Sequence, residues 1–116
     1  MFKIFCYGTL QEPSVQLELI GRTAQGPIDS IENFVVVRDY VDIDDGIAYP
    51  RIVPYENGCV YGRILSFFPE EVIVLDAYET DMYKRVYIST KGGEVVQVYM
   101  PNENVRLIGH SKSVNN

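Results

Sequence analysis

The stretch from Pro69 to Thr80 carries the strongest helical signal in a chain otherwise made of short runs rich in Val, Ile and aromatic residues. A proline suits the first turn of a helix, because the N–H that it lacks would be unpaired there. Glu70 and Glu71 place negative charge at the positive end of the helix dipole. Apolar side chains at positions i, i+3 and i+6 predict one face for packing, formed by Val72, Leu75 and Tyr78.

Most of the remaining chain has the pattern of strands separated by turn residues. The predicted strands lie within residues 2–7, 34–37, 47–53, 59–65, 86–90 and 94–100. A shorter helix is predicted at residues 15–20, where Gly21 would end it. Asn57-Gly58 and Gly92-Gly93 each predict a hairpin turn. We therefore expect an α+β fold, with a small, mostly antiparallel β-barrel of six or seven strands flanked by short helices.

The length and composition fit one domain, which we place at residues 1–110, followed by a frayed tail at 111–116. A net charge of −6 argues against a general nucleic-acid or anionic-membrane surface. No run approaches the roughly 18 apolar residues of a spanning helix, and the N-terminus lacks the pattern of a signal peptide. We expect a cytoplasmic protein, monomer or homodimer, without nucleic-acid or membrane partners.

The cysteines and the histidine limit the chemistry that this chain can use. Cys6 and Cys59 both lie in apolar runs, and we expect two buried free thiols. Two cysteines without a nearby histidine do not make a structural zinc site, so we expect no metal and no cofactor. His110, the only histidine, lies in a polar segment and is a poor partner for a nucleophile. In a metal-free enzyme of neutral pH, a carboxylate, Lys or Tyr must then move the protons.

Glu79, at the end of the predicted helix, is the candidate for that role. A carboxylate held partly out of water has a raised pKa and can transfer protons near neutral pH. The alternative is a structural ion pair between Glu79 and Lys84 or Arg85, which contributes little energy when solvated. Asp76 lies one helical turn before Glu79, and we expect it to have a structural role through local hydrogen bonds.

Residues 7–10 follow the first predicted strand and lead through a glycine turn toward the first short helix. A strand, a turn and a helix start place several unpaired backbone N–H groups at one spot. Such a spot suits an anion, for example a carboxylate.

Taken in chain order, these segments resemble one family. Tyr7–Leu10 reads YGTL and resembles the YGTL/YGSL signature of the γ-glutamylcyclotransferase-like superfamily, which includes AIG2-like and γ-glutamylamine cyclotransferase-like proteins. Leu75–Glu79, with Tyr83 and Arg85 after it, resembles that family's LDxYEG…YxR segment. Val60–Ile64 resembles the strand that leads into the family's helix. The resemblance covers about residues 2–100.

The resemblance implies a γ-glutamylcyclotransferase-like barrel and an enzymatic activity, that of a transferase or lyase. Family members release 5-oxoproline and a free amine or amino acid from a γ-glutamyl amine or peptide. The resemblance implies that Glu79 is the catalytic acid and base, and that the partner is a small γ-glutamyl substrate. We expect the substrate to be bound by Tyr7, Gly8, Thr9, Leu10 and Tyr83.

Two segments depart from the family pattern. Thr80 stands where the family usually has glycine, and threonine is unfavourable if that position needs a positive φ. Gln11–Pro13 replaces an Arg-rich, Gly-containing segment. The departure at Thr80 favours an alternative function, that of a non-catalytic small-molecule binding protein on the same barrel. A stress or interaction protein, whose surface matters more than its pocket, is a third hypothesis.

Overall fold

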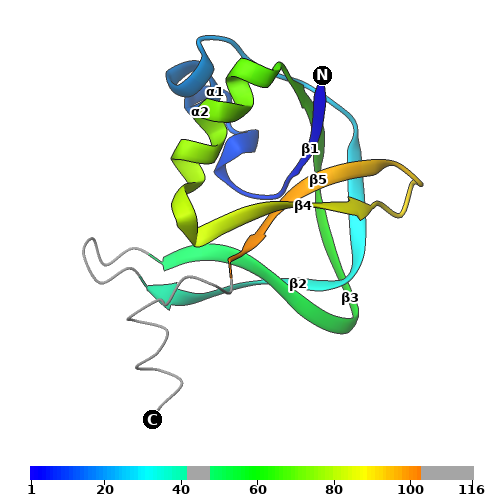
Figure 1. Cartoon of the computed structure of the whole chain (residues 1–116). Coiled ribbons are helices and arrows are strands. Elements are labelled where there is room, and N and C mark those ends of the chain that lie inside the picture. The colour runs from blue at the N-terminus through cyan, green and yellow to red at the C-terminus, as the bar shows by residue number, and fades with distance from the viewer. Residues whose placement is uncertain (42–47, 103–116) are drawn as a thin grey trace.

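The computed structural model describes residues 1–41 and 48–102, without the side chains of 39–49, and shows a curled sheet with two helices against it (Figure 1). His110 and the predicted tail at 111–116 lie outside the described residues. The strands are β1 (Phe2–Cys6), β2 (Ile28–Val41), β3 (Ala48–Phe67), β4 (Tyr83–Ser89) and β5 (Val95–Pro101). The helices are α1 (Pro13–Ile20) and α2 (Pro69–Glu79), with short 3₁₀ turns at Thr9–Gln11 and Thr80–Met82.

The five described strands form one sheet in the order β2-β3-β1-β5-β4. All neighbouring pairs are antiparallel except β1 and β5, which run parallel with Ile4 opposite Gln97. The long β2–β3 hairpin sweeps around the rest of the sheet, so that the sheet curls into a half-barrel (Figure 1). The expected α+β class and mostly antiparallel barrel are confirmed. The described strands are fewer than the six or seven expected, because β2 and β3 run for 14 and 20 residues.

The hairpin turn predicted at Asn57-Gly58 is wrong, because both residues lie inside β3. The β2–β3 register slips there, from Glu32 opposite Cys59 to Phe34 opposite Pro54, so that four residues of β3 face one of β2. Asn57 has a φ of 65°, and its N–H donates to Asn33 Oδ1 at 3.1 Å. The left-handed conformation that Asn tolerates serves a bulge here as well as it would serve a turn.

The core lies on both faces of the curled sheet, because successive residues of a strand point to opposite sides. Ile4 and Cys6 of β1 pack with α2 residues Val72 and Leu75 on the helix-covered face, whereas Phe5 belongs to the second cluster. The predicted helix at α2 and its buried face are thus confirmed, except that Tyr78 is 41% exposed. Cys6 and Cys59 are both free, as expected. Cys59 is exposed, so the prediction that both thiols are buried is wrong.

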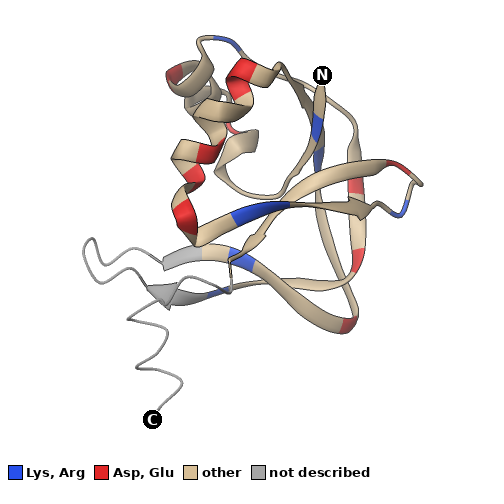
Figure 2. Cartoon of the chain, in the orientation of Figure 1, with Lys and Arg blue, Asp and Glu red and all other residues tan. Residues whose placement is uncertain are grey.

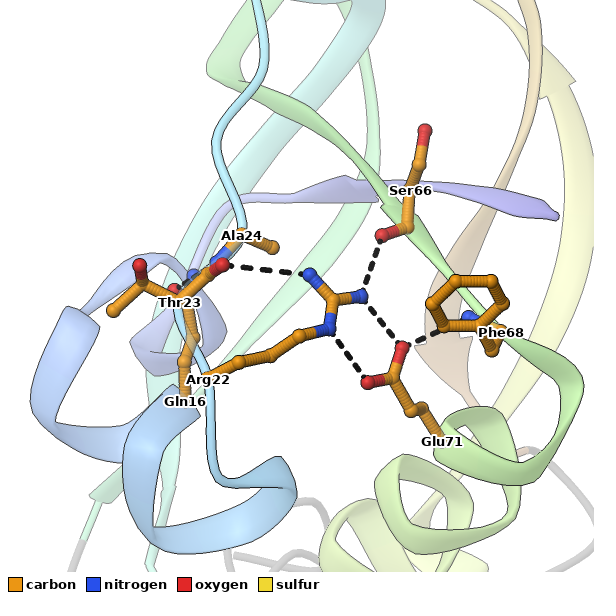
Figure 3. A network of polar contacts seen from close by, with 7 residues as sticks. All are labelled: Gln16, Arg22, Thr23, Ala24, Ser66, Phe68 and Glu71. Carbon is orange, nitrogen blue, oxygen red and sulfur yellow. Dashed lines mark hydrogen bonds and ion pairs between the residues drawn. The ribbon is translucent and has the colours of Figure 1, made fainter.

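A polar network holds the start of α2 in place (Figure 3). Arg22, just after α1, donates to both carboxylate oxygens of Glu71, at 2.7 and 2.6 Å, and to the carbonyl of Ser66 at 3.3 Å. The N–H of Phe68 also donates to Glu71, at 2.9 Å. The network therefore joins the chain after α1, the end of β3 and the first turn of α2. In the described parts of the chain, neither helix has the length and apolarity needed to cross a membrane.

Candidate active site

A cavity of about 470 Å³ lies where the end of β1, the C-terminal end of α2 and the β2–β3 hairpin meet. Small-molecule sites usually measure roughly 300–1,000 Å³, so the cavity is large enough for such a ligand. Its described lining comprises residues 5–10, Arg38, Pro50, residues 78–80, Met82, Tyr83 and Tyr99.

The loop after β1 forms one wall of the cavity. Tyr7 donates its hydroxyl to the carbonyl of Tyr99 at 2.9 Å, and the buried Leu10 packs into the core beneath the loop. The hydroxyls of Thr9 and Tyr78 lie 2.8 Å apart, which ties the loop to the last turn of α2. Gly8 faces the ring of Pro50, which a Cβ at Gly8 would approach to 3.8 Å.

The loop continues into the 3₁₀ turn at Thr9–Gln11, whose first backbone N–H groups have no acceptor within the turn. The N–H of Gln11 donates to the carbonyl of Gly8 at 3.2 Å, and that of Glu12 to Thr9 at 2.9 Å. The first N–H groups of a helical turn have no partner inside that turn, and these belong here to Thr9 and Leu10. The loop therefore supplies donors beside the cavity.

A buried glutamine fixes the loop from behind. Gln16 of α1 is 3% exposed, donates its side-chain amide to the carbonyl of Leu10 at 2.8 Å, and accepts from the N–H of Ala24 at 2.8 Å. Both ends of this amide are thus satisfied, which makes its burial inexpensive. No sequence pattern identifies Gln16, because its partners are backbone atoms that only the folded chain brings together.

Glu79 lies at the C-terminal end of α2 and lines the same cavity as the loop. Burial raises the pKa of its carboxyl to about 7, and the negative charge of nearby Asp76 adds to the shift. The predicted alternative, an ion pair with Lys84 or Arg85, is absent among the described residues: Arg85 pairs with Asp76, and Lys84 is exposed. A carboxyl group that titrates near neutral pH therefore lies next to the loop donors.

Asp76, one turn earlier on α2, has the opposite surroundings. Arg85 donates to its two oxygens at 2.7 and 3.0 Å, and the Tyr99 hydroxyl donates at 2.7 Å. Burial alone would raise the pKa of Asp76, but these donors hold it below its usual range. Asp76 lines a neighbouring polar hollow and not the cavity itself. These contacts agree with the structural role expected for Asp76.

Thr80 follows Glu79 and has a backbone conformation that glycine normally occupies. Its φ is 63° and its ψ is −171°, a region almost reserved for glycine. Its hydroxyl oxygen accepts a hydrogen bond from the N–H of Met82 at 3.3 Å. The turn after Glu79 is therefore built with a positive φ in spite of the threonine.

The structure brings the sequence-predicted residues to one cavity: Tyr7, Gly8, Thr9, Leu10, Glu79 and Tyr83. The Tyr83 hydroxyl donates to the carbonyl of Pro50 at 2.6 Å. Arg38, Pro50 and Met82 also line the cavity and were not among the predicted site residues. No local pattern marks Arg38 or Pro50, because the β2–β3 hairpin reaches the cavity only through long-range strand pairing. The described residues contain no group of three His, Cys, Asp or Glu side chains that could hold a metal ion.

The half-barrel sheet with two helices is the fold of γ-glutamyl cyclotransferase-like proteins. Residues 4–113 match the family described as "Gamma-glutamyl cyclotransferase, AIG2-like". The chain therefore belongs to the AIG2-like γ-glutamyl cyclotransferase family.

Individual relatives agree with this assignment. The chain is 33% identical over 89 residues to AIG2-like protein A of Arabidopsis thaliana, which covers 76% of this chain and 51% of that protein. The chain thus spans about half the length of the curated relatives that it matches.

Two solved structures share the fold. One is a solution structure from Arabidopsis thaliana, with a TM-score of 0.69 and 23% identity over 98% of this chain and 74% of that one. The other is called "Gamma-glutamyl cyclotransferase", with a TM-score of 0.68 and 17% identity over 86% of this chain and 66% of that one.

Proposed function

We propose that the protein is a γ-glutamyl cyclotransferase, which releases 5-oxoproline and a free amine or amino acid from a γ-glutamyl amine or peptide. Glu79 serves as the general base and then as the general acid. One observation carries the proposal: the carboxyl group of Glu79 is partly buried, has a pKa of about 7 and shares a cavity with the loop at residues 7–10. The cytoplasmic location expected from the sequence stays a prediction.

The reaction needs no nucleophile from the protein. The α-amino nitrogen of the glutamyl group attacks the carbonyl carbon of its own side chain, which closes a five-membered ring. The amide bond to the leaving amine then breaks. The α-ammonium nitrogen loses one proton before it attacks and a second one after the ring bond has formed. Glu79 passes both protons in turn to the leaving nitrogen, which departs as an ammonium group, so that atoms and charge balance without water. Holding the two reacting groups in the correct orientation also lowers the barrier to ring closure.

The pKa of Glu79 fits the first proton transfer. The α-ammonium group of a γ-glutamyl compound is a weaker acid than a carboxyl group, so proton transfer to an ordinary Glu carboxylate is uphill. The pKa of Glu79 is raised from 4.5 to about 7, which lowers the cost of this transfer by about 3 kcal/mol, at about 1.4 kcal/mol per pKa unit. A pKa near neutral also suits a group that must both accept and return a proton.

The loop donors complement this chemistry. Gly8, Thr9 and Leu10 line the cavity, and their backbone N–H groups would hold the substrate carboxylate or the oxyanion that forms during attack. The non-catalytic alternative was favoured by Thr80. Because Thr80 takes the positive φ itself, the turn at Glu79 keeps a glycine-like geometry, and this favours the catalytic proposal.

The test is a 5-oxoproline assay on a panel of γ-glutamyl amines and γ-glutamyl dipeptides. Glu79→Gln should lower kcat/KM by about 10²–10⁴-fold, which is the usual contribution of a general acid or base. Glu70→Gln is the matched control, since Glu70 is exposed on the same helix and does not line the cavity. The pH profile of kcat/KM should be bell-shaped, with its acid limb near pH 7. Equal activity of both variants, or no turnover of any panel member, would contradict the proposal.

A further inference from the structure

Arg38 is a second charged group in the cavity, and the proposed proton transfer gives it no role. Among the described residues that line the cavity, Arg38 is the only base and Glu79 the only carboxylic acid. Arg38 has no ion pair or hydrogen bond with another described residue, and its side chain is exposed. A guanidinium group in a ligand-sized cavity, without a partner in the described protein, is suited to an anion on the ligand.

Arg38 belongs to the hairpin wall of the cavity. It follows Val37, which is paired with Arg51 of β3, and the neighbouring Pro50 reaches the loop at Gly8. Figure 2 shows basic segments on β2 and on β3, close to where the hairpin is drawn in grey and below the acidic C-terminal end of α2. Arg38 therefore lies on the wall that faces the loop and α2, and its exposure places it toward the mouth of the cavity.

The environment of Glu79 indicates that the two charges do not neutralise each other. A guanidinium group close to a carboxylate lowers the carboxyl pKa by one or more units. The pKa of Glu79 is instead raised, by burial and by the charge of Asp76. Arg38 and Glu79 therefore do not pair, and both charged groups of the cavity are available to a ligand.

The geometry of ring closure decides which part of the ligand each charge meets. The α-amino nitrogen and the side-chain carbonyl carbon must lie beside Glu79, because that group moves the proton. The α-carboxylate is attached to the same carbon as the α-amino group, so it stays at the inner end, beside the loop donors. A carboxylate on the leaving amine would lie beyond the scissile bond, away from Glu79, and Arg38 is the exposed cation of the cavity lining that could bind it there.

We propose that Arg38 binds a carboxylate on the leaving group, so that the preferred substrates are γ-glutamyl amino acids and not γ-glutamyl amines without a carboxylate. This inference rests on the proposed function, whose substrate class it narrows. Arg38 is then a specificity-determining residue and takes no part in proton transfer. Its contribution should appear only with substrates that carry the second carboxylate.

The test compares γ-glutamylalanine with γ-glutamylethylamine, which differ only in that carboxylate. A charge-assisted hydrogen bond contributes about 1.5–3 kcal/mol, so the wild type should prefer γ-glutamylalanine by roughly 10–100-fold in kcat/KM. Arg38→Gln should remove most of this preference and leave γ-glutamylethylamine turnover within about twofold. Arg38→Lys should retain part of the preference. Arg63→Gln is the matched control, because Arg63 is exposed on β3 and does not line the cavity.

Binding measured separately keeps this inference distinct from the proposed function. Calorimetry on Glu79→Gln, with and without Arg38→Gln, gives the dissociation constants of both compounds without turnover. If the wild type forms no 5-oxoproline from any compound, but Glu79→Gln binds γ-glutamylalanine more tightly than γ-glutamylethylamine and Arg38→Gln removes this difference, the role of Arg38 is supported and the proposed function is overturned. The inference is wrong if the wild type has the same kcat/KM for both compounds, or if Arg38→Gln lowers kcat/KM equally for both. Either result leaves the proposed function intact.

Discussion

The two ends of α2 each carry a glutamate, and the two side chains have opposite surroundings. Glu71, in the first turn, is held by two hydrogen bonds from Arg22 and one from the N–H of Phe68, and these keep the pKa of its carboxyl below the usual range. Glu79, in the last turn, forms no ion pair with another described residue, and burial raises its pKa to about 7. The same side chain on the same helix therefore meets two environments.

The helix dipole acts in the same directions. Negative charge is favourable at the N-terminal end of a helix and unfavourable at the C-terminal end. Ionised Glu71 thus contributes to stability, whereas ionising Glu79 costs free energy. The hydrogen bonds of Glu71 therefore hold the N-terminal end of α2 in place, so that the C-terminal end can hold the uncompensated charge of Glu79. Functional sites commonly contain such unfavourable groups, which the surrounding structure must stabilise.

The largest effect that this comparison predicts is on the pH dependence of stability. The folded pKa of Glu79, about 7, exceeds its ordinary value of 4.5, so the native state binds more protons than the unfolded state between these values. The free energy of unfolding should therefore fall as the pH rises from about 4.5 to 7. A shift of this size corresponds to a loss on the order of 3 kcal/mol for Glu79 alone. Urea unfolding at several pH values measures it.

Glu79→Gln should flatten that slope and leave the protein more stable than the wild type at pH 8. Glu70→Gln provides the control, since an exposed carboxylate on the same helix should leave the slope unchanged. If the wild type and Glu79→Gln lose stability in parallel between pH 5 and 8, Glu79 is not the group that titrates near neutral pH.

A smaller effect is expected from breaking the anchor at the other end. Arg22→Met leaves the 13%-exposed carboxylate of Glu71 without its cation and should lower the free energy of unfolding by about 1–2 kcal/mol at pH 7. The estimate is modest because the Arg22 side chain is itself 35% exposed. The pKa of Glu71 is lowered in the native state by its hydrogen bonds from Arg22, so its stabilising contribution is lost as the pH falls below the ordinary Glu value of 4.5. The difference between variant and wild type should shrink in that range.

A double-mutant cycle with Glu71→Gln isolates the pair from the packing of the Arg22 side chain over the ring of Phe68. If the double variant loses as much free energy of unfolding as the two single variants together, Arg22 and Glu71 do not stabilise each other.

Local sequence patterns were sufficient for the parts of the fold that depend on neighbouring residues. The helix at Pro69–Glu79 followed from its first-turn proline and its apolar spacing, and the β4–β5 hairpin from Gly92-Gly93. Glu79 and the loop at residues 7–10 emerged from a resemblance to one family, and the structure places them at one cavity. Their catalytic and binding roles remain predictions.

Long-range contacts account for what the sequence did not reveal. Asn57 has the same left-handed backbone in a bulge as in a hairpin turn, so its local signal does not distinguish the two. Cys59 follows that bulge, and a one-residue change of register decides whether a strand residue faces the core or the solvent. Arg38 reaches the cavity only through the β2–β3 pairing, and Arg85 pairs with Asp76 across the α2–β4 turn. No spacing rule predicts these partners.

The smallest predicted effect concerns Thr80, which ends α2 just beyond the uncompensated charge of Glu79. A non-glycine residue in this region of φ and ψ costs about 1–3 kcal/mol, and glycine loses about 0.5–1 kcal/mol more entropy on folding. Thr80→Gly should therefore stabilise the protein by about 1 kcal/mol in urea unfolding. Thr80→Ala keeps the strained backbone and loses the acceptor for the N–H of Met82, so it should destabilise slightly. If Thr80→Gly has a lower free energy of unfolding than Thr80→Ala, the positive φ of Thr80 stores no strain, and the C-terminal end of α2 is not strained at this position.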